Sequence, residues 1–357
     1  MELDITRWTS YMLGFKRNYL NINVVMVKTI MFFAVMIALF GALSDWTEST
    51  LLEKDQLIPE RNKSIYAIQR EPEETIDILV LGDSLSYSSV SPMSLWNRHG
   101  YTAFVCGQPG QNMFESEELL KIALETQSPK VVILETNAIF QDRLKGRTLN
   151  DTMDTLFNYY LPLFRGHDVW KSLVMKKEYA EVGYTKYKGF PFRGDVKPYE
   201  KGAYMNETDK KAELPEKNME HLQNIMDMCR DCEAELILLG TPSPSNYNYS
   251  VHNAIAEYAD KQGLTYLDMN LITEEIGIDW NTDTLDKGDH LNLSGAEKVT
   301  EYLGRYLSDN YSLTDHRGDA AFDQWTKVAA EYDEKASQKL TEMRGIQTND
   351  RKKDNDH

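Results

Sequence analysis

Cysteine is scarce: the chain has three cysteines among 357 residues, and only Cys229 and Cys232 stand close together in the sequence. So few thiols exclude a disulfide framework of the kind that holds small secreted domains together. The pair could be redox-active or supply half of a metal site, but no second CxxC and no Cys/His cluster completes four ligands. We therefore expect structural cysteines, no bound metal ion and no cofactor.

Basic residues are also in short supply. The chain has 39 lysines and arginines against 56 aspartates and glutamates, which gives a formal net charge of −17 at neutral pH. Binding to a phosphate backbone needs a basic face on the protein. This balance therefore excludes nucleic acid as a partner or a substrate.

Long apolar runs are missing except near the N-terminus. Residues 29–43 contain no charge, and Val24 to Val27 extend the run across Lys28. The resulting stretch of about 20 residues is long enough to cross the hydrocarbon core of a membrane if Lys28 reaches the interface. We expect a transmembrane anchor at residues 24–44, and a cleavable signal peptide is the alternative.

Charges on the two sides of this stretch predict its orientation. Lys16 and Arg17 precede it, whereas Asp45 and Glu48 follow it. By the positive-inside rule, residues 1–23 face the cytoplasm and the chain after the anchor lies outside the cell membrane. About 28 residues precede the run, which is long for the n-region of a cleavable signal, so an uncleaved single-pass anchor is favoured.

Beyond the anchor, short apolar runs alternate with helical patterns. Strands buried on both faces of a sheet are expected at residues 76–81, 103–106, 131–134, 236–239 and 266–268. Helices are expected at residues 113–126, 215–229, 253–262 and 294–308. The last helix has an N-cap candidate, Ser294, with Glu297 at the capping-box spacing. The alternation predicts an α/β domain with a parallel sheet and three layers.

Composition divides the rest of the chain. Polar residues 45–75 are predicted to form a juxtamembrane stalk, residues 76–311 the α/β domain, and residues 312–357 a polar C-terminal tail. Within the domain, residues 141–214 form a long segment rich in Tyr, Phe and Lys/Arg between the third and fourth strands. Crossovers are normally far shorter, so we expect this segment to be an insertion with its own role, such as a lid.

Polar or Gly-rich turns follow the strands, at the sheet edge where ligands bind in open α/β folds. They are residues 82–84, 107–110, 135–137 and, before the last helix, 286–292. Ser84 is the candidate nucleophile and His290 the base that removes its proton, with a carboxylate to hold the histidine tautomer. The Ser84 N–H, a glycine N–H from the second turn and an amide from the third can stabilise an oxyanion.

These four turns resemble the sequence blocks of the SGNH (GDSL-type) hydrolase family, which supply Ser, Gly, Asn and His in that order. Gly82-Asp83-Ser84 matches the first block, Gly110 takes the oxyanion-glycine place and Asn137 matches the third block. The resemblance covers about 215 residues. It implies a three-layer α/β/α flavodoxin-like fold, an acyl-serine intermediate, and an oxyanion hole formed by Ser84, Gly110 and Asn137.

Two blocks depart from the family pattern. The third lacks the glycine and aspartate that flank Asn137 in the GxND motif of the family. The last should be DxxH, but a lysine stands three residues before His290, with Asp286 four before it and Asp289 directly before it. Gly288 could allow a bulged turn that brings Asp286 to the histidine. Asp286 is therefore favoured as the triad acid, and Asp289 is the alternative.

The insertion carries aromatic residues beside basic ones. We expect substrate binding by Tyr160, Arg165, His167 and Trp170, because aromatic faces stack on sugar rings; a Tyr/Phe-rich subcore is the alternative. An anchored SGNH protein with such an insertion is similar to members that modify bacterial surface polymers, such as the D-alanyl-lipoteichoic acid transfer protein and the alginate O-acetylation proteins. The resemblance implies a cell-surface polysaccharide or acylated glycan as substrate and a multispanning membrane O-acyltransferase as a partner.

The expected function is an extracytoplasmic O-acyltransferase or O-acyl esterase acting on a cell-surface glycan. The two share the acyl-serine intermediate and differ in whether a sugar hydroxyl or water accepts the acyl group. A membrane-tethered lipase or general esterase and a non-catalytic cell-envelope scaffold are the alternatives. An exposed apolar groove near Ser84 would favour the lipase, and the altered DxxH block leaves the scaffold open.

Overall fold

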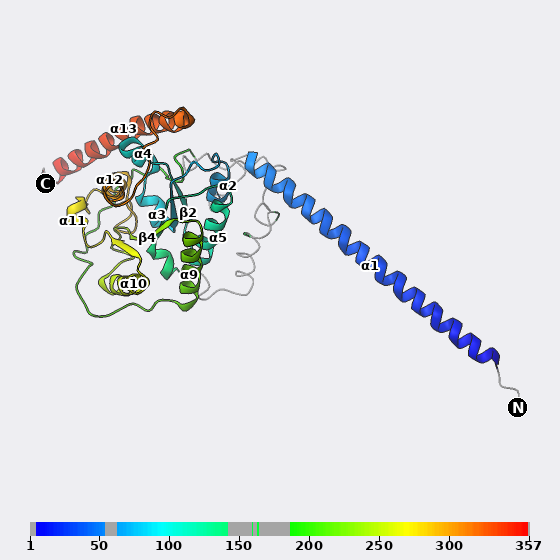
Figure 1. Ribbon diagram of the computed structural model, residues 1–357. Helices are drawn as coiled ribbons and strands as arrows, with labels where there is room; N and C mark the ends of the chain where they lie inside the picture. The colour runs from blue at the N-terminus through cyan, green and yellow to red at the C-terminus, as the bar shows by residue number, and fades with distance from the viewer. Residues whose placement is uncertain (1–4, 54–62, 142–158, 160–162, 164–185, 356–357) are drawn as a thin grey trace.

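A parallel sheet lies at the centre of the α/β domain (Figure 1). The structure, a computed structural model, describes residues 5–53, 63–141, 159, 163 and 186–355. Five strands pair in the order β2-β1-β3-β4-β5. They are β1 (Ile78–Gly82), β2 (Ala103–Gly107), β3 (Val131–Glu135), β4 (Glu235–Gly240) and β5 (Thr265–Asp268). The flavodoxin-like order and the all-parallel pairing confirm the predicted α/β class.

Both faces of the sheet are buried, as the uninterrupted apolar runs predict. In β1, Leu79 and Leu81 pack into one hydrophobic cluster, and Ile78 and Val80 pack into the other. The first cluster contains residues of α2 (Lys63–Gln69), α5 (Met113–Leu124), α9 (Glu216–Asp231) and α10 (Tyr249–Gln262). The second contains residues of α4 (Pro92–His99), α11 (Thr273–Ile276) and α12 (Leu293–Asn310). The result is the predicted three-layer arrangement.

Helix α12 begins earlier than the capping-box pattern predicts. Its N-cap is Asn292, whose side-chain oxygen accepts hydrogen bonds from the main-chain N–H groups two and three residues further on. Glu297 closes no capping box, because one of its carboxylate oxygens accepts from the hydroxyl groups of Ser94 and Tyr332. The N-cap prediction of Ser294 was therefore wrong: an asparagine two residues upstream takes the same donors.

Helix α1 (Ile5–Glu53) extends away from the α/β domain (Figure 1). Its section Val24–Thr50 is long and apolar enough to cross a membrane, although a signal sequence would also have these properties. Apolar side chains are exposed on every side of this section, with Ile37 71% exposed, whereas a helix packed on a soluble core shows one apolar face. The helix continues past the expected end of the anchor at residue 44, because the acidic residues there do not interrupt it.

Two segments that composition placed outside the domain belong to it. Helix α2 lies in the expected stalk, yet its Ile65 and Ile68 are fully buried. Helix α13 (Asp323–Asn355) lies in the expected tail, yet its Trp325 is buried with the ring centroid 5.5 Å from that of Trp96 in α4. The boundaries at residues 76 and 311 were therefore wrong. Burial here depends on a few well-spaced apolar residues, which the average composition of a polar segment hides.

The insertion is described at residues 141, 159, 163 and 186–214. The last of these ranges contains no helix or strand and covers the outer edge of β2, where the Val105 N–H donates to the Lys188 carbonyl at 2.9 Å. It then passes the start of α12, where the Leu293 N–H donates to the Arg193 carbonyl at 2.7 Å. The predicted substrate-binding residues lie outside the described part of the chain, so their role stays a prediction: Tyr160, Arg165, His167 and Trp170.

Candidate active site

Ser84 lies where β1 ends and α3 (Ser84–Ser89) begins. Gly82 closes the strand at φ +142°, and a Cβ atom there would lie 2.7 Å from Cβ of Glu135, so glycine alone fits. Asp83 then caps the helix by accepting from a main-chain N–H of the first turn at 2.9 Å. Within residues 76–96, Ser84 is the one residue that is not buried. The turn thus exposes a single hydroxyl where the strand order reverses beside β1, the usual place for a ligand site.

His290 lies in a tight turn before α12. The arms of the turn meet at an antiparallel bridge between Thr284 and Leu291. At its tip, Lys287 and Gly288 have φ values of 67° and 89°, in the left-handed region. This reversal brings the carboxylate that precedes His290 by four residues back to the histidine ring.

Ser84, His290 and Asp286 form a continuous hydrogen-bonded chain. The Ser84 Oγ lies 2.7 Å from Nε2 of His290. Nδ1 of the same ring lies 2.7 Å from Oδ2 of Asp286, and Oδ1 of Asp286 accepts the main-chain N–H of His290, also at 2.7 Å. This order of atoms is the one that a Ser-His-Asp unit needs to remove the serine proton.

Asp289, the alternative acid, is turned towards other partners. Its nearer oxygen lies 3.5 Å from Nδ1 of His290, beyond a good hydrogen bond. Its other oxygen accepts from the side-chain amide of Asn246 at 2.6 Å, and its main-chain carbonyl accepts from the Ser243 hydroxyl at 2.7 Å. Asp289 therefore fastens the turn to the loop after β4, and Asp286 is the carboxylate in contact with the histidine.

Asn137 reaches the Ser84 turn from the end of β3. It is the second residue of the short helix η3 (Thr136–Phe140), and its side-chain amide donates to Oδ2 of Asp83 at 2.7 Å. Gln141 donates to the same oxygen at 2.8 Å. An amide nitrogen carries two hydrogens, so the bond to Asp83 fixes Asn137 while the second hydrogen stays available for a ligand. Asp83 thus acts as a structural ligand of the turn.

Gly110 lies in the turn after β2. It is three residues past Gly107, which pairs with Gly82 across the sheet, and its φ is 56°. The Ser84 N–H belongs to the first turn of a helix, where N–H groups have no partner within the helix. The structure therefore places Gly110 and Asn137, the two other residues expected in an oxyanion hole, at the same sheet edge as Ser84.

Two buried carboxyl groups lie beneath this edge. Asp83 is 1% exposed and Glu135 is fully buried. Burial raises the pKa of Glu135 well above its ordinary value, and the nearby charge of Asp83 raises it further. Burial also raises the pKa of Asp83, but hydrogen bonds from three N–H donors and the charge of His290 oppose this. Both buried carboxyl groups therefore disfavour their charged forms, Glu135 more strongly than Asp83.

Three residues that hold the site together were missed from sequence: Glu135, Gln141 and Asn246. Glu135 accepts from the Asn137 N–H at 3.0 Å, and its other oxygen lies 2.6 Å from the Tyr247 hydroxyl. A charged residue at the end of an otherwise apolar strand was an available signal for Glu135. No comparable signal marks Gln141 or Asn246. Each contacts a residue far away in the sequence, Asp83 and Asp289 respectively, and these contacts exist only in the folded protein.

Asp286, Asp289 and His290 also form a possible cation site, since one ligand atom from each lies within 4.8 Å of the others. The histidine atom nearest to both carboxylates is Nδ1. A metal ion there would replace the hydrogen bond between His290 and Asp286. Three partly exposed ligands also fall short of the four that structural zinc takes. The geometry therefore favours a hydrogen-bonded triad.

No model of a known protein family matches the sequence, and no curated protein matches it. Solved structures are similar to it at low identity. A lipase/acylhydrolase from Enterococcus faecalis is 11% identical, with 67% of this chain and 99% of that chain covered and a TM-score of 0.36. A GDSL-like lipase from Bacteroides thetaiotaomicron VPI-5482 is 12% identical (65% and 87% covered, TM-score 0.33), and TesA is 13% identical (65% and 98% covered, TM-score 0.34). TM-scores this low carry no argument for a function, which has to come from the site itself.

Proposed function

We propose that this chain is a membrane-anchored serine enzyme of the SGNH type, which transfers or hydrolyses O-acyl groups on a cell-surface glycan. The observation that carries the proposal is the hydrogen-bonded chain from Ser84 Oγ through both ring nitrogens of His290 to Asp286. A fold of this kind hosts many functions, so the assignment depends on the site and not on the sheet.

The geometry suits a two-step acyl transfer. Ser84 Oγ attacks the acyl carbonyl carbon while Nε2 of His290 takes its proton, and Asp286 stabilises the imidazolium that forms. The bond to the leaving oxygen then breaks as that oxygen takes the proton from His290, which leaves an acyl-serine. Water or a sugar hydroxyl next gives its proton to His290 and attacks the carbonyl carbon of the acyl-serine. The bond from that carbon to Ser84 Oγ breaks, and Oγ takes the proton back from His290. Water as acceptor makes the enzyme an esterase, and a sugar hydroxyl makes it a transferase.

Negative charge that develops on the carbonyl oxygen needs donors. The main-chain N–H groups of Ser84 and Gly110 and the second amide hydrogen of Asn137 are the groups assigned to this role. Each such donor typically stabilises the transition state by about 3 kcal/mol. Asp83 accepts from a main-chain N–H of the Ser84 turn and from the Asn137 amide, and these two bonds hold two of the donors in place.

A polar substrate with a small acyl group is favoured over a lipid. Outside α1, Leu271 is the one large apolar side chain that is exposed in the described part of the chain. A lipase needs an apolar groove beside its nucleophile to hold a long acyl chain. The contact between Asp286 and His290 likewise supports an enzyme over a scaffold, because a protein that keeps the fold without chemistry has no need of it.

The anchor and the flanking charges support an extracytoplasmic site. In this arrangement α1 spans the cell membrane with its N-terminus in the cytoplasm, and the α/β domain faces surface polymers. Acyl groups made in the cytoplasm must cross the membrane to reach it. A multispanning O-acyltransferase that delivers them is therefore the proposed partner.

The experiment is to incubate the full chain, in detergent, with p-nitrophenyl acetate and with a fluorophosphonate that labels activated serines. We expect ester turnover and labelling at Ser84, both lost in Ser84→Ala and in His290→Ala, because the two residues act as one unit. The matched control is Ser308→Ala, an exposed serine of α12, which should leave both signals unchanged. Turnover that persists undiminished in Ser84→Ala would remove the acyl-serine mechanism.

A further inference from the structure

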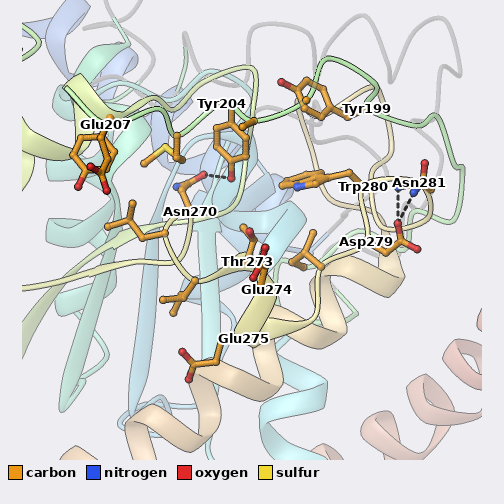
Figure 2. Close-up of a pocket in the computed structure, with 17 residues that line it drawn as sticks. Tyr199, Tyr204, Glu207, Asn270, Thr273, Glu274, Glu275, Asp279, Trp280 and Asn281 are labelled. Atoms are coloured by element: carbon orange, nitrogen blue, oxygen red, sulfur yellow. Dashed lines mark hydrogen bonds between the residues drawn. The ribbon is translucent and has the colours of Figure 1, made fainter.

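A cavity of about 970 Å³ lies beside the turn that carries His290. Residues 199–207 of the insertion form one side of it, and the loop after β5 together with α11 forms the other (Figure 2). A Cβ atom at Gly288 would lie 2.8 Å from the ring of Tyr199, so this ring packs directly on the turn between Asp286 and His290. One residue of the cavity lining thus contacts the turn that carries the catalytic histidine.

Hydrogen bonds join the cavity to the same turn. The Tyr204 hydroxyl donates to Oδ1 of Asn270 at 3.0 Å, as Figure 2 shows, and the Ser243 N–H donates to that oxygen at 2.9 Å. The Ser243 hydroxyl in turn donates to the main-chain carbonyl of Asp289 at 2.7 Å. A ligand that contacts Tyr204 is therefore two hydrogen-bonded residues away from the turn of the catalytic histidine.

Three rings, which we call the aromatic wall, line the cavity: Tyr199, Tyr204 and Trp280. They pack edge to face with one another, with centroids 5.8 to 6.4 Å apart, and each is only partly buried. Edge-to-face packing fixes the rings before a ligand arrives, so stacking on them costs little side-chain entropy. Fixed and accessible ring faces suit the flat apolar faces of sugar rings.

Charge decides which sugars fit. Four carboxylates line the cavity, and none of its lining residues is a lysine, arginine or histidine: the four are Glu207, Glu274, Glu275 and Asp279. These carboxylates would repel an anionic sugar, whereas they would attract the positive charge of an amine-bearing sugar. The exposed amide side chain of Asn281 adds a hydrogen-bonding group to the lining.

We infer that this cavity is the acceptor-glycan subsite, which binds uncharged or amine-bearing sugars and rejects anionic ones. The inference rests on the proposed function for its role as an acceptor site, but sugar binding itself does not require chemistry. The aromatic wall supplies stacking, the carboxylates select against uronic acids and phosphorylated sugars, and Tyr199 sets the bound chain next to the His290 turn.

The test measures binding by calorimetry to the full chain in detergent, carrying Ser84→Ala so that no turnover interferes. The probes are hexamers of glucosamine, N-acetylglucosamine and galacturonic acid at mildly acidic pH. We expect affinity to fall in that order, with galacturonate at least about tenfold weaker than N-acetylglucosamine. Adding Trp280→Ala should lower the affinity for the glucosamine and N-acetylglucosamine hexamers about tenfold, because stacking on one ring contributes about that much. The matched control is Tyr306→Ala, a partly buried tyrosine of α12 outside the cavity lining, which should change neither.

A second variant covers the case in which Trp280→Ala disturbs folding. Glu274→Gln keeps the size of an exposed side chain and should lower the preference for glucosamine over N-acetylglucosamine about two- to fivefold. Equal binding of all three hexamers, or no change in that preference, would overturn the inference. Hydrolysis of acetyl esters without sugar binding would reject the subsite alone, whereas sugar binding without a reactive Ser84 would reject the proposed function alone.

Discussion

Asp286 contacts His290 twice, with one carboxylate oxygen 2.7 Å from Nδ1 and the other accepting the main-chain N–H of the histidine at 2.7 Å. The first contact sets the tautomer of the ring, and the second fixes the carboxylate relative to the histidine backbone. The acid precedes its base by four positions, in a turn that lies outside the sheet. The altered DxxH spacing is compatible with a triad for this reason.

Replacing Asp286 with Asn should cripple the enzyme. The amide would hold the wrong histidine tautomer, a change that lowers turnover about 10⁴-fold in serine proteases. We expect a loss of that order in kcat for p-nitrophenyl acetate. Asp289→Asn is the matched control and should cost much less, because Asp289 bonds to Asn246. A greater loss in Asp289→Asn would move the acid to that residue and leave the mechanism standing.

Asn137→Ala should act on kcat and leave KM nearly unchanged. The amide is assigned to the oxyanion, which exists only in the transition state, and loss of one donor typically lowers kcat about 10²- to 10³-fold. Gln141→Ala is the control: it also removes a donor to Asp83 but has no assigned contact with the substrate. Equal losses in the two variants would show that Asn137 only supports Asp83.

Glu135 should make the protein less stable as the pH rises. Burial raises the pKa of Glu135 well above its ordinary value, so the folded chain keeps a proton that the unfolded chain loses above about pH 4.3. Between the unfolded and folded pKa values the folded state binds more protons, so the free energy of unfolding falls with rising pH across that window. Glu135→Gln cannot ionise and should flatten the fall.

The measurement is the thermal midpoint Tm of the full chain in detergent at about pH 5, 7 and 9, which covers the side of the window above the unfolded pKa. Glu220→Gln is the matched control, because Glu220 is exposed on α9. An unchanged Tm profile in Glu135→Gln would mean that Glu135 is ionised in the folded protein. Glu135→Ala should lower Tm at every pH, since it also removes the acceptor for the Asn137 N–H.

Helix α13 should be required for a stable domain. Trp325 is 4% exposed and packs against Trp96, so Trp325→Ala leaves a cavity and should cost about 3 to 5 kcal/mol. Denaturant unfolding followed by circular dichroism measures the loss. Gln338→Ala, at an exposed position of the same helix, should change stability by no more than about 0.5 kcal/mol. If the two variants were equally stable, residues after 311 would be a tail after all.

The orientation of the anchor can be tested with alkaline phosphatase, which is active only outside the cytoplasm. A fusion after residue 357 should be active, and a control fusion after residue 23 should be inactive, because the positive flank stays inside. Activity of the second fusion alone would place the α/β domain in the cytoplasm and remove the extracytoplasmic substrate.

The sheet and the position of Ser84 could be predicted because both depend on residues that are close together in the sequence. The run at residues 131–134 is apolar throughout, which indicates burial on both faces, and Ser84 follows a similar run through a glycine and a capping aspartate. The choice between Asp286 and Asp289 stayed open because it depends on two successive left-handed residues. One of them is Lys287, at which such a conformation is rarely expected.

Contacts between distant segments could not be predicted. Glu135 meets Tyr247 only once the end of β3 and the loop after β4 come together, and its raised pKa follows from burial that the sequence does not reveal. The cavity beside the His290 turn forms where Tyr199 of the insertion contacts Trp280. These two residues are far apart in the sequence, so the cavity could not be predicted from it. Average composition also hid α2 and α13, whose few apolar residues complete the core.

Helix α2 has a consequence for reach. It begins at Lys63, while α1 ends at Glu53, and a chain of that length spans at most about 36 Å however it is arranged. The Ser64 hydroxyl of α2 donates at 2.8 Å to the carbonyl of Gly107, at the sheet edge where Ser84 lies. If α1 spans the membrane as proposed, this short connection keeps Ser84 within a few nanometres of the lipid surface. Substrates held at the membrane would then meet Ser84 at a high effective concentration, and substrates released into the medium would meet it far less often.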